Sequence, residues 1–282
     1  MAETQSGEGP NDNSYALGRS AAERSRLILQ EHVIGSSTAA FLNRAGVARG
    51  MRVLDIGSGS GDVAMRVAGL VGPAGSVLGV EIDDASVQIA RDRAAAAGIS
   101  NVKFVTADVM TADLGSGFDA LIGRLVLMHV ADPVKALRRL AVSLRPGGLV
   151  AFQEAHLEAA WLSFPTSPTL QHVQRLRDLA LQQGQPVYFQ MGLALRSAFV
   201  RAGLAEPEIT ADLVVGGGPD WAGFELVETT VRSLRPGWLR LGVDGADEIE
   251  PDGLADRLRA EIGRDGLLAM YPLINASSHT PS

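Results

Sequence analysis

Residues 53–62, with the sequence VLDIGSGSGD, place three glycines at alternate positions directly after an apolar run. Glycine removes the side chain where a chain turns sharply and where a ligand lies against the backbone, and the following helix offers N–H groups without intrahelical partners. Glu81 ends a second apolar run about 20 residues later, and its carboxylate can accept hydrogen bonds from both hydroxyls of a ribose. The two motifs together predict a site for a nucleoside cofactor.

Two carboxylates help to decide which nucleoside such a site would hold. Residues 59–64 also fit the dinucleotide pattern, with alanine in the third place, and a dinucleotide would lay its pyrophosphate on the helix N-terminus. Asp62 occupies that first turn and Asp55 closes the strand before it, so a pyrophosphate would meet two negative charges. S-adenosylmethionine (SAM) brings a sulfonium and an ammonium group to the same place. The sequence therefore favours SAM.

Further motifs follow in an order known from one enzyme family. Residues 102–109 (VKFVTADV) and 118–124 (FDALIGR) are apolar runs with a polar end, and residues 144–152 (LRPGGLVAF) combine a helix stop with another apolar run. Together with the glycine loop and Glu81, these segments resemble the class I SAM-dependent methyltransferases over roughly residues 51–154. The resemblance is to the small-molecule type related to the quinone-biosynthesis enzymes.

The resemblance implies which residues would bind the cofactor. The glycine loop with Ser58 would border the methionine part of SAM, Glu81 the ribose, and Asp108 the adenine amino group. Tyr15 belongs to a segment before the core that either folds over the cofactor or simply packs on the protein. The expected cofactor contacts are Tyr15, Asp55, Gly57, Ser58, Gly59, Gly61, Glu81, Ile82, Asp108, Val109, Gly123 and Arg124.

The implied reaction moves the SAM methyl group to an O, N or C atom of a small organic acceptor and leaves S-adenosylhomocysteine. The sulfonium is already a strong electrophile, so the protein mainly aligns donor and acceptor. Where the acceptor must lose a proton, Glu154 is the first candidate base, because it follows an apolar strand at the sheet's carboxyl edge, and His156 and His129 are the other candidates. Each has a structural alternative: Glu154 as a hydrogen-bond partner of the lid or the cofactor helix, His156 as the start of the lid, His129 as a packing residue.

The alternation of apolar strands and helices predicts an α/β fold, a Rossmann-like doubly wound sheet of seven strands with helical cap insertions. The sheet would be mostly parallel, with an antiparallel C-terminal strand. Four aromatic residues of the insertions and their flanks either form a wall for the acceptor or belong to the cap core: Trp161, Tyr188, Trp221 and Tyr271. The expected divisions are a disordered tail (1–13), an N-terminal helical segment (14–50), the SAM-binding core (51–154), a lid insertion (155–185), a continuation of the core (186–216), a second helical insertion (217–266) and the closing strand (267–278).

Composition narrows the class of partner. The chain has 282 residues and no cysteine, which excludes disulfides, thiolate metal sites and cysteine nucleophiles and fits a reducing cytoplasm. The formal net charge of −7 disfavours a nucleic-acid partner. No apolar run is long enough to span a membrane and no signal segment is present, and the dispersed histidines and acids predict no metal site.

Other functions stay open at this level. An NAD-dependent reductase or epimerase shares the sheet and the acidic ribose contact, although the chain lacks a Tyr-x-x-x-Lys pair. A SAM-binding protein without catalysis fits the same motifs. The acceptor, a specialised metabolite or a quinone-like ring, is suggested by family analogy alone, and a divalent ion could arrive with a catechol-like substrate. The insertions could equally form the surface of a homodimer.

Overall fold

The computed structural model describes residues 21–159, 161–183 and 188–281, with side chains from Arg26 onward. The predicted tail 1–13 and the predicted cofactor contact Tyr15 lie outside the described residues. Within them, no helix is both long and apolar enough to cross a membrane.

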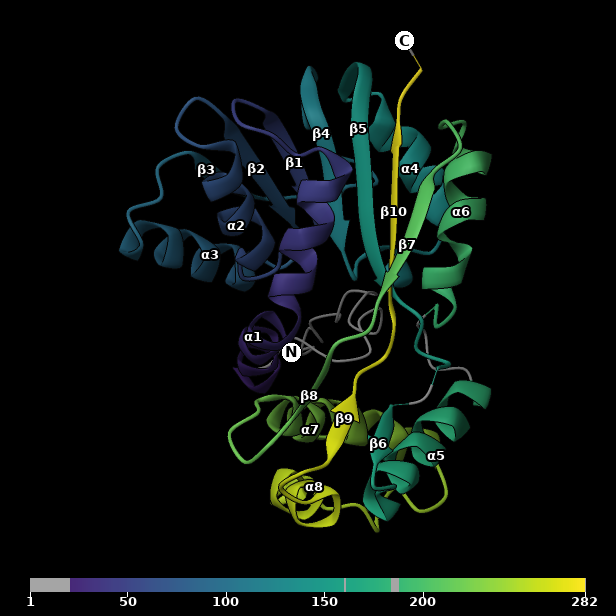
Figure 1. Cartoon of the computed structure of the whole chain (residues 1–282). Helices are drawn as coiled ribbons and strands as arrows, with labels where there is room; N and C mark the ends of the chain where they lie inside the picture. The colour runs from purple at the N-terminus through teal and green to yellow at the C-terminus, as the bar shows by residue number, and fades with distance from the viewer. Residues whose placement is uncertain (1–20, 160, 184–187, 282) are drawn as a thin grey trace, which may run out of the picture.

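A seven-stranded sheet forms the upper part of the molecule in Figure 1, in the order β3-β2-β1-β4-β5-β10-β7. Strand β10 pairs antiparallel with both of its neighbours, and the pairs among β1 to β5 are parallel. This arrangement confirms the predicted Rossmann-like sheet with an antiparallel C-terminal strand. The strands are β1 (Arg52–Ile56), β2 (Ser76–Glu81), β3 (Val102–Thr106), β4 (Phe118–Arg124), β5 (Leu144–Ala155), β7 (Glu208–Asp212) and β10 (Leu273–His279).

Helices cover both faces of this sheet because successive strand residues point to opposite sides. On one face α1 (Ala21–Ala45), α2 (Asp62–Val71) and α3 (Asp84–Ala96) enclose an apolar cluster that includes Val53 and Ile122. On the other, α4 (Pro133–Ala141) and α6 (Met191–Ala202) pack against a second cluster. The sheet is thereby fixed as a rigid base.

The turn into β5 differs from its predicted form. Helix α4 ends at Ala141, and Leu144 already pairs with Phe118 of β4. Residues 144–148, predicted as the helix stop, therefore belong to the strand. A register shift between Phe118 and Ala120 accommodates this start of the strand.

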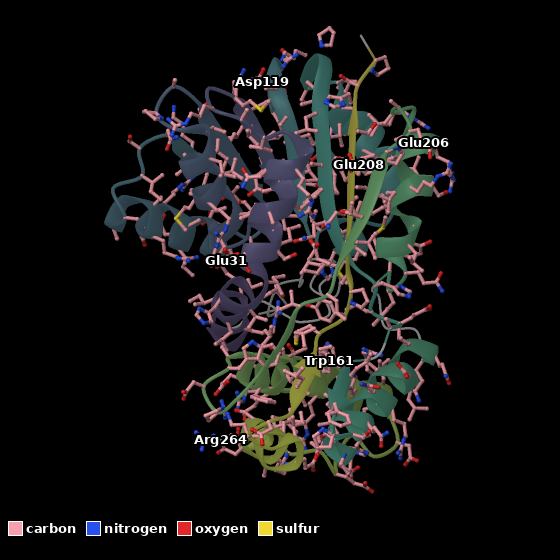
Figure 2. The ribbon with its side chains drawn as sticks, viewed as in Figure 1. Glu31, Asp119, Trp161, Glu206, Glu208 and Arg264 are labelled. Carbon is pink, nitrogen blue, oxygen red and sulfur yellow. The ribbon has the colours of Figure 1, made fainter. Side chains whose placement is uncertain are left out.

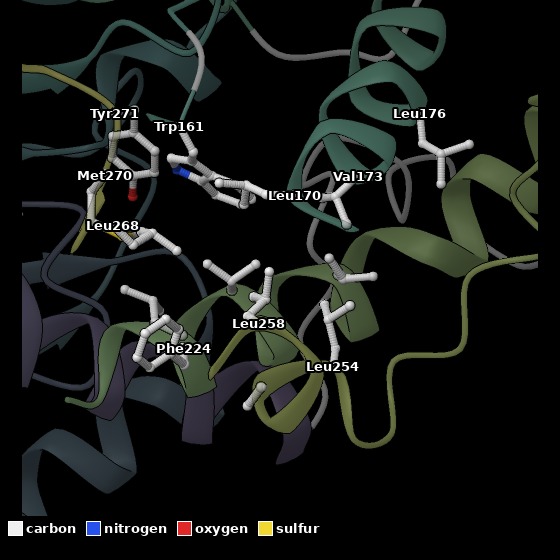
Figure 3. Packing of buried hydrophobic residues seen from close by; sticks show 14 of the residues in the cluster. Trp161, Leu170, Val173, Leu176, Phe224, Leu254, Leu258, Leu268, Met270 and Tyr271 are labelled. Atoms are coloured by element: carbon white, nitrogen blue, oxygen red, sulfur yellow. The ribbon is translucent and has the colours of Figure 1, made fainter. Parts of the chain in front are cut away.

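A cap lies below the carboxyl ends of the core strands (Figure 1). It contains the helices α5 (Pro168–Gln182), α7 (Gly223–Leu241) and α8 (Leu254–Ile262). A small antiparallel sheet joins them, in the order β6-β9-β8, formed by β6 (Leu162–Phe164), β9 (Leu267–Ala269) and β8 (Val215–Gly217). Figure 3 shows the apolar residues that these elements bury, among them Leu170, Phe224, Leu258 and Leu268.

Two boundaries differ from the predicted divisions. The closing strand β10 begins at Leu273 and not at 267, since residues 267–269 form β9 of the cap sheet. Pro272 stands between the two strands, and proline has no N–H group to donate to a ladder. Similarly, β8 at Val215–Gly217 leaves the core after β7 and joins the cap. Both extensions carry the chain from the core sheet into the cap.

Candidate functional site

A cavity of about 430 Å³ lies where the carboxyl ends of the core strands meet the cap. Ligands of open α/β sheets bind at this edge, so the position is the expected one. Glu81 and Asp108 line it from the core, Trp161 and Tyr271 from the cap, and Arg26 from α1. Its walls therefore come from parts of the chain that lie far apart in the sequence.

The glycine loop borders this cavity through Gly57, Ser58 and Gly59, whereas Gly61, also predicted as a cofactor contact, does not line it. Two positions of the loop tolerate no larger residue. Gly57 and Gly61 have φ angles of 63° and 86°, in the left-handed region. A Cβ atom at Gly61 would lie 2.7 Å from the ring of Phe104, and one at Gly57 would lie 2.4 Å from a methyl group of Val126. Both the backbone conformation and the packing thus require glycine here.

Glu81 holds that loop against the end of β2. Its Oε2 accepts a hydrogen bond from the backbone N–H of Gly59 at 3.0 Å. Its Oε1 accepts from the N–H groups of Ile82 at 2.8 Å and Asp83 at 3.1 Å. Because a carboxylate oxygen has two lone pairs, Oε2 can accept one further bond. The residue is positioned by its own neighbours and lines the cavity.

Asp55 is a buried carboxyl group at the end of β1 that also lines the cavity. Its Oδ2 has no hydrogen-bond partner in the described part of the chain. Burial raises the pKa of Asp55 to about 8, with Glu81 and Asp62 adding to the shift and Arg124 opposing it. A cationic ligand group beside Asp55 would lower this pKa again and ionise the carboxyl.

Asp62 stands at the start of α2, and its charge is compensated. Arg93 of α3 donates from Nη2 to Asp62 Oδ1 at 2.6 Å and from Nη1 to the carbonyl of Ser60 at 2.7 Å. The sequence predicted that Asp55 and Asp62 would both present negative charge to a pyrophosphate. This prediction is wrong in part, because Asp62 is paired with Arg93 and the pKa of Asp55 is raised.

Three further predicted cofactor contacts, Asp108, Val109 and Ile82, line the cavity. The backbone N–H of Met110 donates to Asp108 Oδ1 at 2.8 Å, which fixes the carboxylate after β3. Ile82 is 56% exposed, so its side chain is available to a flat ligand ring.

Of the two predicted contacts at the end of β4, Arg124 lines the cavity and Gly123 does not. A Cβ atom at Gly123 would overlap Phe152 and Val126. Arg124 donates from Nη1 to Glu31 Oε2 at 2.6 Å. Glu31 also pairs with Arg66, and Figure 2 shows it on α1 where the sheet meets the cap. Arg124 thus ties the end of β4 to α1.

Glu154 does not line the cavity, although it was the first candidate base. It is fully buried within β5 and accepts hydrogen bonds from the backbone N–H groups of Val126, Leu127 and Met128, at 3.0, 2.8 and 3.4 Å. Burial raises its pKa to about 7, against the lowering effect of these bonds. This geometry favours a structural role, but the partners lie in the loop after β4 and not in the lid or the cofactor helix, as the sequence had suggested.

The two candidate histidines, His129 and His156, differ in whether they line the cavity. His129, at the end of the short 3₁₀ helix Leu127–His129, lines the cavity, and burial followed by the charge of Arg26 lowers its pKa to about 4. Its imidazole is therefore neutral at pH 7. His156 does not line the cavity; its backbone N–H donates to the carbonyl of Pro272.

Two of the four candidate aromatic residues reach the cavity. Trp161 and Tyr271 line it and stack on each other, with ring centroids 6.4 Å apart (Figure 3). Tyr188 is half exposed and Trp221 packs edge-on against Phe224; neither lines the cavity. Of the four predicted aromatic residues, Trp161 and Tyr271 are therefore the two that are placed to contact an acceptor.

Sequence reasoning missed several polar residues of the cavity, three of them with long side chains from helices. Arg26 and Gln30 of α1 are buried there, with Arg26 Nη1 donating to Gln30 Oε1 at 2.7 Å, and Arg177 of α5 is the third. None stands in a motif, and only helix packing brings them to the cavity. No group of three or more His, Asp or Glu side chains that could hold a metal ion occurs among the described residues.

Comparisons with known proteins point in one direction. A family model described as a methyltransferase domain matches residues 48–185. The ubiquinone/menaquinone biosynthesis C-methyltransferase UbiE of Idiomarina loihiensis is 37% identical over 131 residues, which cover 46% of this chain and 49% of that protein. The UbiE of Azotobacter vinelandii is 39% identical over 106 residues, 37% of this chain and 42% of that protein. The chain thus spans about half the length of the curated relatives it matches.

Solved structures share the fold at low identity. A phosphoethanolamine N-methyltransferase of Haemonchus contortus, in complex with phosphomonomethylethanolamine and S-adenosylhomocysteine, has a TM-score of 0.58 and 18% identity, and the match covers 91% of this chain and 57% of that chain. A putative methyltransferase from Bacillus halodurans has a TM-score of 0.59 and 17% identity, covering 87% and 100%.

Proposed function

We propose, from the premise that this chain carries a class I SAM-dependent methyltransferase domain related to the quinone C-methyltransferases, that the protein transfers the methyl group of SAM to a small organic acceptor. The observation that carries the proposal is one continuous cavity, bounded on one side by the glycine loop and Glu81 and on the other by an apolar cap. Donor and acceptor would meet inside it, shielded from water.

The core wall suits SAM in shape and charge. Gly57 and Gly59 line the cavity without side chains, so a ligand can lie against the backbone there, and Glu81 Oε2 retains a lone pair for a ribose hydroxyl. The buried Asp55 Oδ2, which lacks a partner in the described chain, would be satisfied by the cationic methionine end. SAM supplies an electrophilic methyl group; the chain supplies the alignment.

Alignment and exclusion of water carry most of the proposed catalysis. Holding two reactants in a productive geometry can contribute as much as about 7 to 11 kcal/mol. Trp161 and Tyr271 would orient the acceptor from the cap. Among the three predicted bases, His129 is the one that lines the cavity. Its imidazole is neutral at pH 7, but a pKa of about 4 makes it a weak base, so it would assist only an acceptor whose proton is already acidic. Glu154 and His156 would act only indirectly, by holding the backbone.

We extend the proposal to the acceptor, the location and the oligomeric state. The acceptor would belong to specialised metabolism or be a quinone-like ring, the location would be the cytoplasm, and the protein would not bind nucleic acid, given its net charge of −7. A homodimer is supported by the exposed side chains of Leu162, Phe164 and Leu267 on the cap sheet. Light scattering of wild type and Phe164→Ser would test it, with a shift toward monomer expected.

Binding of the cofactor is the first test. Isothermal titration with SAM, S-adenosylhomocysteine and NADH in parallel should give micromolar dissociation constants for the first two and no binding of NADH. Release of S-adenosylhomocysteine in the presence of small phenols, amines and quinols then reports transfer. Binding of NADH alone would return the glycine loop to the dinucleotide class, and binding of SAM without any transfer would favour a non-catalytic SAM-binding protein.

A further inference from the structure

Arg177 of α5 is a buried cation in the cap wall of the cavity. Its side chain is 7% exposed and lines the cavity. Its Nε and Nη2 donate to Asp178 Oδ1 at 3.3 and 3.0 Å. Its Nη1 is buried and has no hydrogen-bond partner within the described residues. A buried guanidinium donor without an acceptor is costly, so this nitrogen is a strong candidate for a ligand contact.

Trp161 has a second buried N–H donor without an acceptor among the described residues. This donor is the indole Nε1, and Trp161 lines the cavity. The side chain of Gln174 donates to the Trp161 carbonyl, which ties this residue to α5 one turn before Arg177. Two buried N–H groups without an acceptor among the described residues thus belong to residues that line the cavity from the cap.

Charge is divided between the two walls. The acids that line the cavity belong to the core strands, their loops or the start of α2: Asp55, Asp62, Glu81, Asp83 and Asp108. The cap contributes no acidic residue to the described lining, whereas it contributes Arg177, and α1 contributes the buried Arg26. The core also contributes one cation, Arg124, but this guanidinium is paired with Glu31. A negatively charged ligand group is therefore favoured on the cap side and disfavoured on the core side.

We infer that the methyl acceptor carries a carboxylate on an apolar, ring-shaped body, and that Arg177 Nη1 and Trp161 Nε1 hold this carboxylate. The inference rests on the proposed function and adds the chemical class of the acceptor. A planar guanidinium fits a carboxylate oxygen, and Asp178 fixes its orientation. The stacked rings of Trp161 and Tyr271 provide the surface for the apolar body. Arg177 is a positioning residue, because it orients the acceptor without taking part in the transfer.

Matched pairs of neutral and anionic probes test the inference without knowledge of the acceptor. The protein, saturated with S-adenosylhomocysteine, is titrated with benzoate and benzamide and with 2-naphthoate and 2-naphthamide. We expect the wild type to bind each acid about 10- to 150-fold more tightly than its amide, as for a hydrogen bond to a charged group. Arg177→Met should lose this preference while its affinity for the amides changes less than about twofold.

Control variants distinguish the loss of the Arg177 charge from a general disturbance of helix α5. Arg175→Met changes an exposed arginine of the same helix and should keep the wild-type preference. Trp161→Phe retains an aromatic ring without the N–H and should weaken acid binding by about 5- to 10-fold. If Arg177→Met does not fold, the comparison of acid and amide in the wild type still decides. Equal binding of both members, or binding of neither, overturns the inference, while failure of the wild type to bind S-adenosylhomocysteine overturns the proposed function instead.

Discussion

The two walls of the cavity are built on different principles. The core wall consists of loops that directly follow strands, with backbone N–H groups and short carboxylates such as Glu81 and Asp108 as its polar groups. The cap wall consists of side chains from distant segments, chiefly Trp161, Arg177 and Tyr271. The first wall can change little without losing its geometry, whereas the second can change residue by residue. Under the proposed function the first wall would recognise the cofactor and the second the acceptor, so the two kinds of recognition would be separable.

Gly61→Ala should give the largest effect on the core wall. The left-handed φ and the overlap with Phe104 together predict a loss of about 3 to 5 kcal/mol in the free energy of unfolding and a loss of SAM binding. Urea denaturation measures the stability. Gly98→Ala is the matched control, because Gly98 also has a positive φ but would meet no atom within 4 Å, so it should cost only about 1 to 2 kcal/mol.

Asp55→Asn should separate stability from SAM binding. The folded-state pKa of about 8 lies above the ordinary 3.8, so the folded protein keeps a proton that the unfolded chain releases. Stability from this group is fully present below pH 3.8 and is lost as the pH rises to about 8. The variant should flatten this decline and be about 2 to 4 kcal/mol more stable at pH 8, yet bind SAM less tightly. Thermal unfolding from pH 5 to 9 checks the first part; an unchanged slope contradicts it.

Glu81→Ala should weaken SAM binding by about 1 to 3 kcal/mol, since a ribose contact and the anchor of Gly59 are both removed. If the two walls are separable, the dissociation constants of the aromatic acids in the preceding section should change less than about twofold. Titration of both ligands against one preparation measures the contrast. Asp92→Ala, on the exposed side of α3, serves as the control. An equal loss of affinity for SAM and for the aromatic acids would show that the two walls do not act independently.

Glu154→Gln should have the smallest effect on turnover. The amide can still accept from Val126 and Leu127, but its NH₂ group opposes the N–H of Met128, so we expect a loss of stability of about 1 to 2 kcal/mol. Turnover at saturating acceptor should fall less than about tenfold, in contrast to the 10²- to 10⁴-fold loss expected for a general base. A larger fall in a variant that still folds would restore Glu154 as the base.

The contrast between the walls also explains what the sequence reveals. Glu81 and Glu154 both follow apolar runs, and from the sequence the two are equivalent. Strand β2 ends at Glu81, whereas β5 continues to Ala155 and pairs Glu154 with Ile274, so the second carboxylate stays inside the sheet. Strand ends are set by neighbouring strands, which the local pattern does not encode.

The cap wall was harder to predict for two reasons. Its strands are three residues long, too short for a period-2 pattern to be distinguished from a loop. Arg177 reaches the cavity through the packing of α5 against α7 and α8, and nothing in its neighbouring sequence marks it. The core sheet, by contrast, was predictable because its strands are longer apolar runs followed by glycines or by polar residues such as Glu81 and Asp108.

Helix α1 has a consequence for how the protein is made. It packs against α2, β5 and β10 of the core and against α7 of the cap, and Ile34 is completely buried in the cap cluster. During synthesis α1 leaves the ribosome roughly ten to forty seconds before α7 has been translated. The apolar side of α1 is covered only when α7 is present. Because the two helices are far apart in the sequence, we expect their contact to form late in folding. We therefore expect the α1 side of the cavity to form only after α7 is available, and a nascent chain halted before α7 to expose the apolar side of α1.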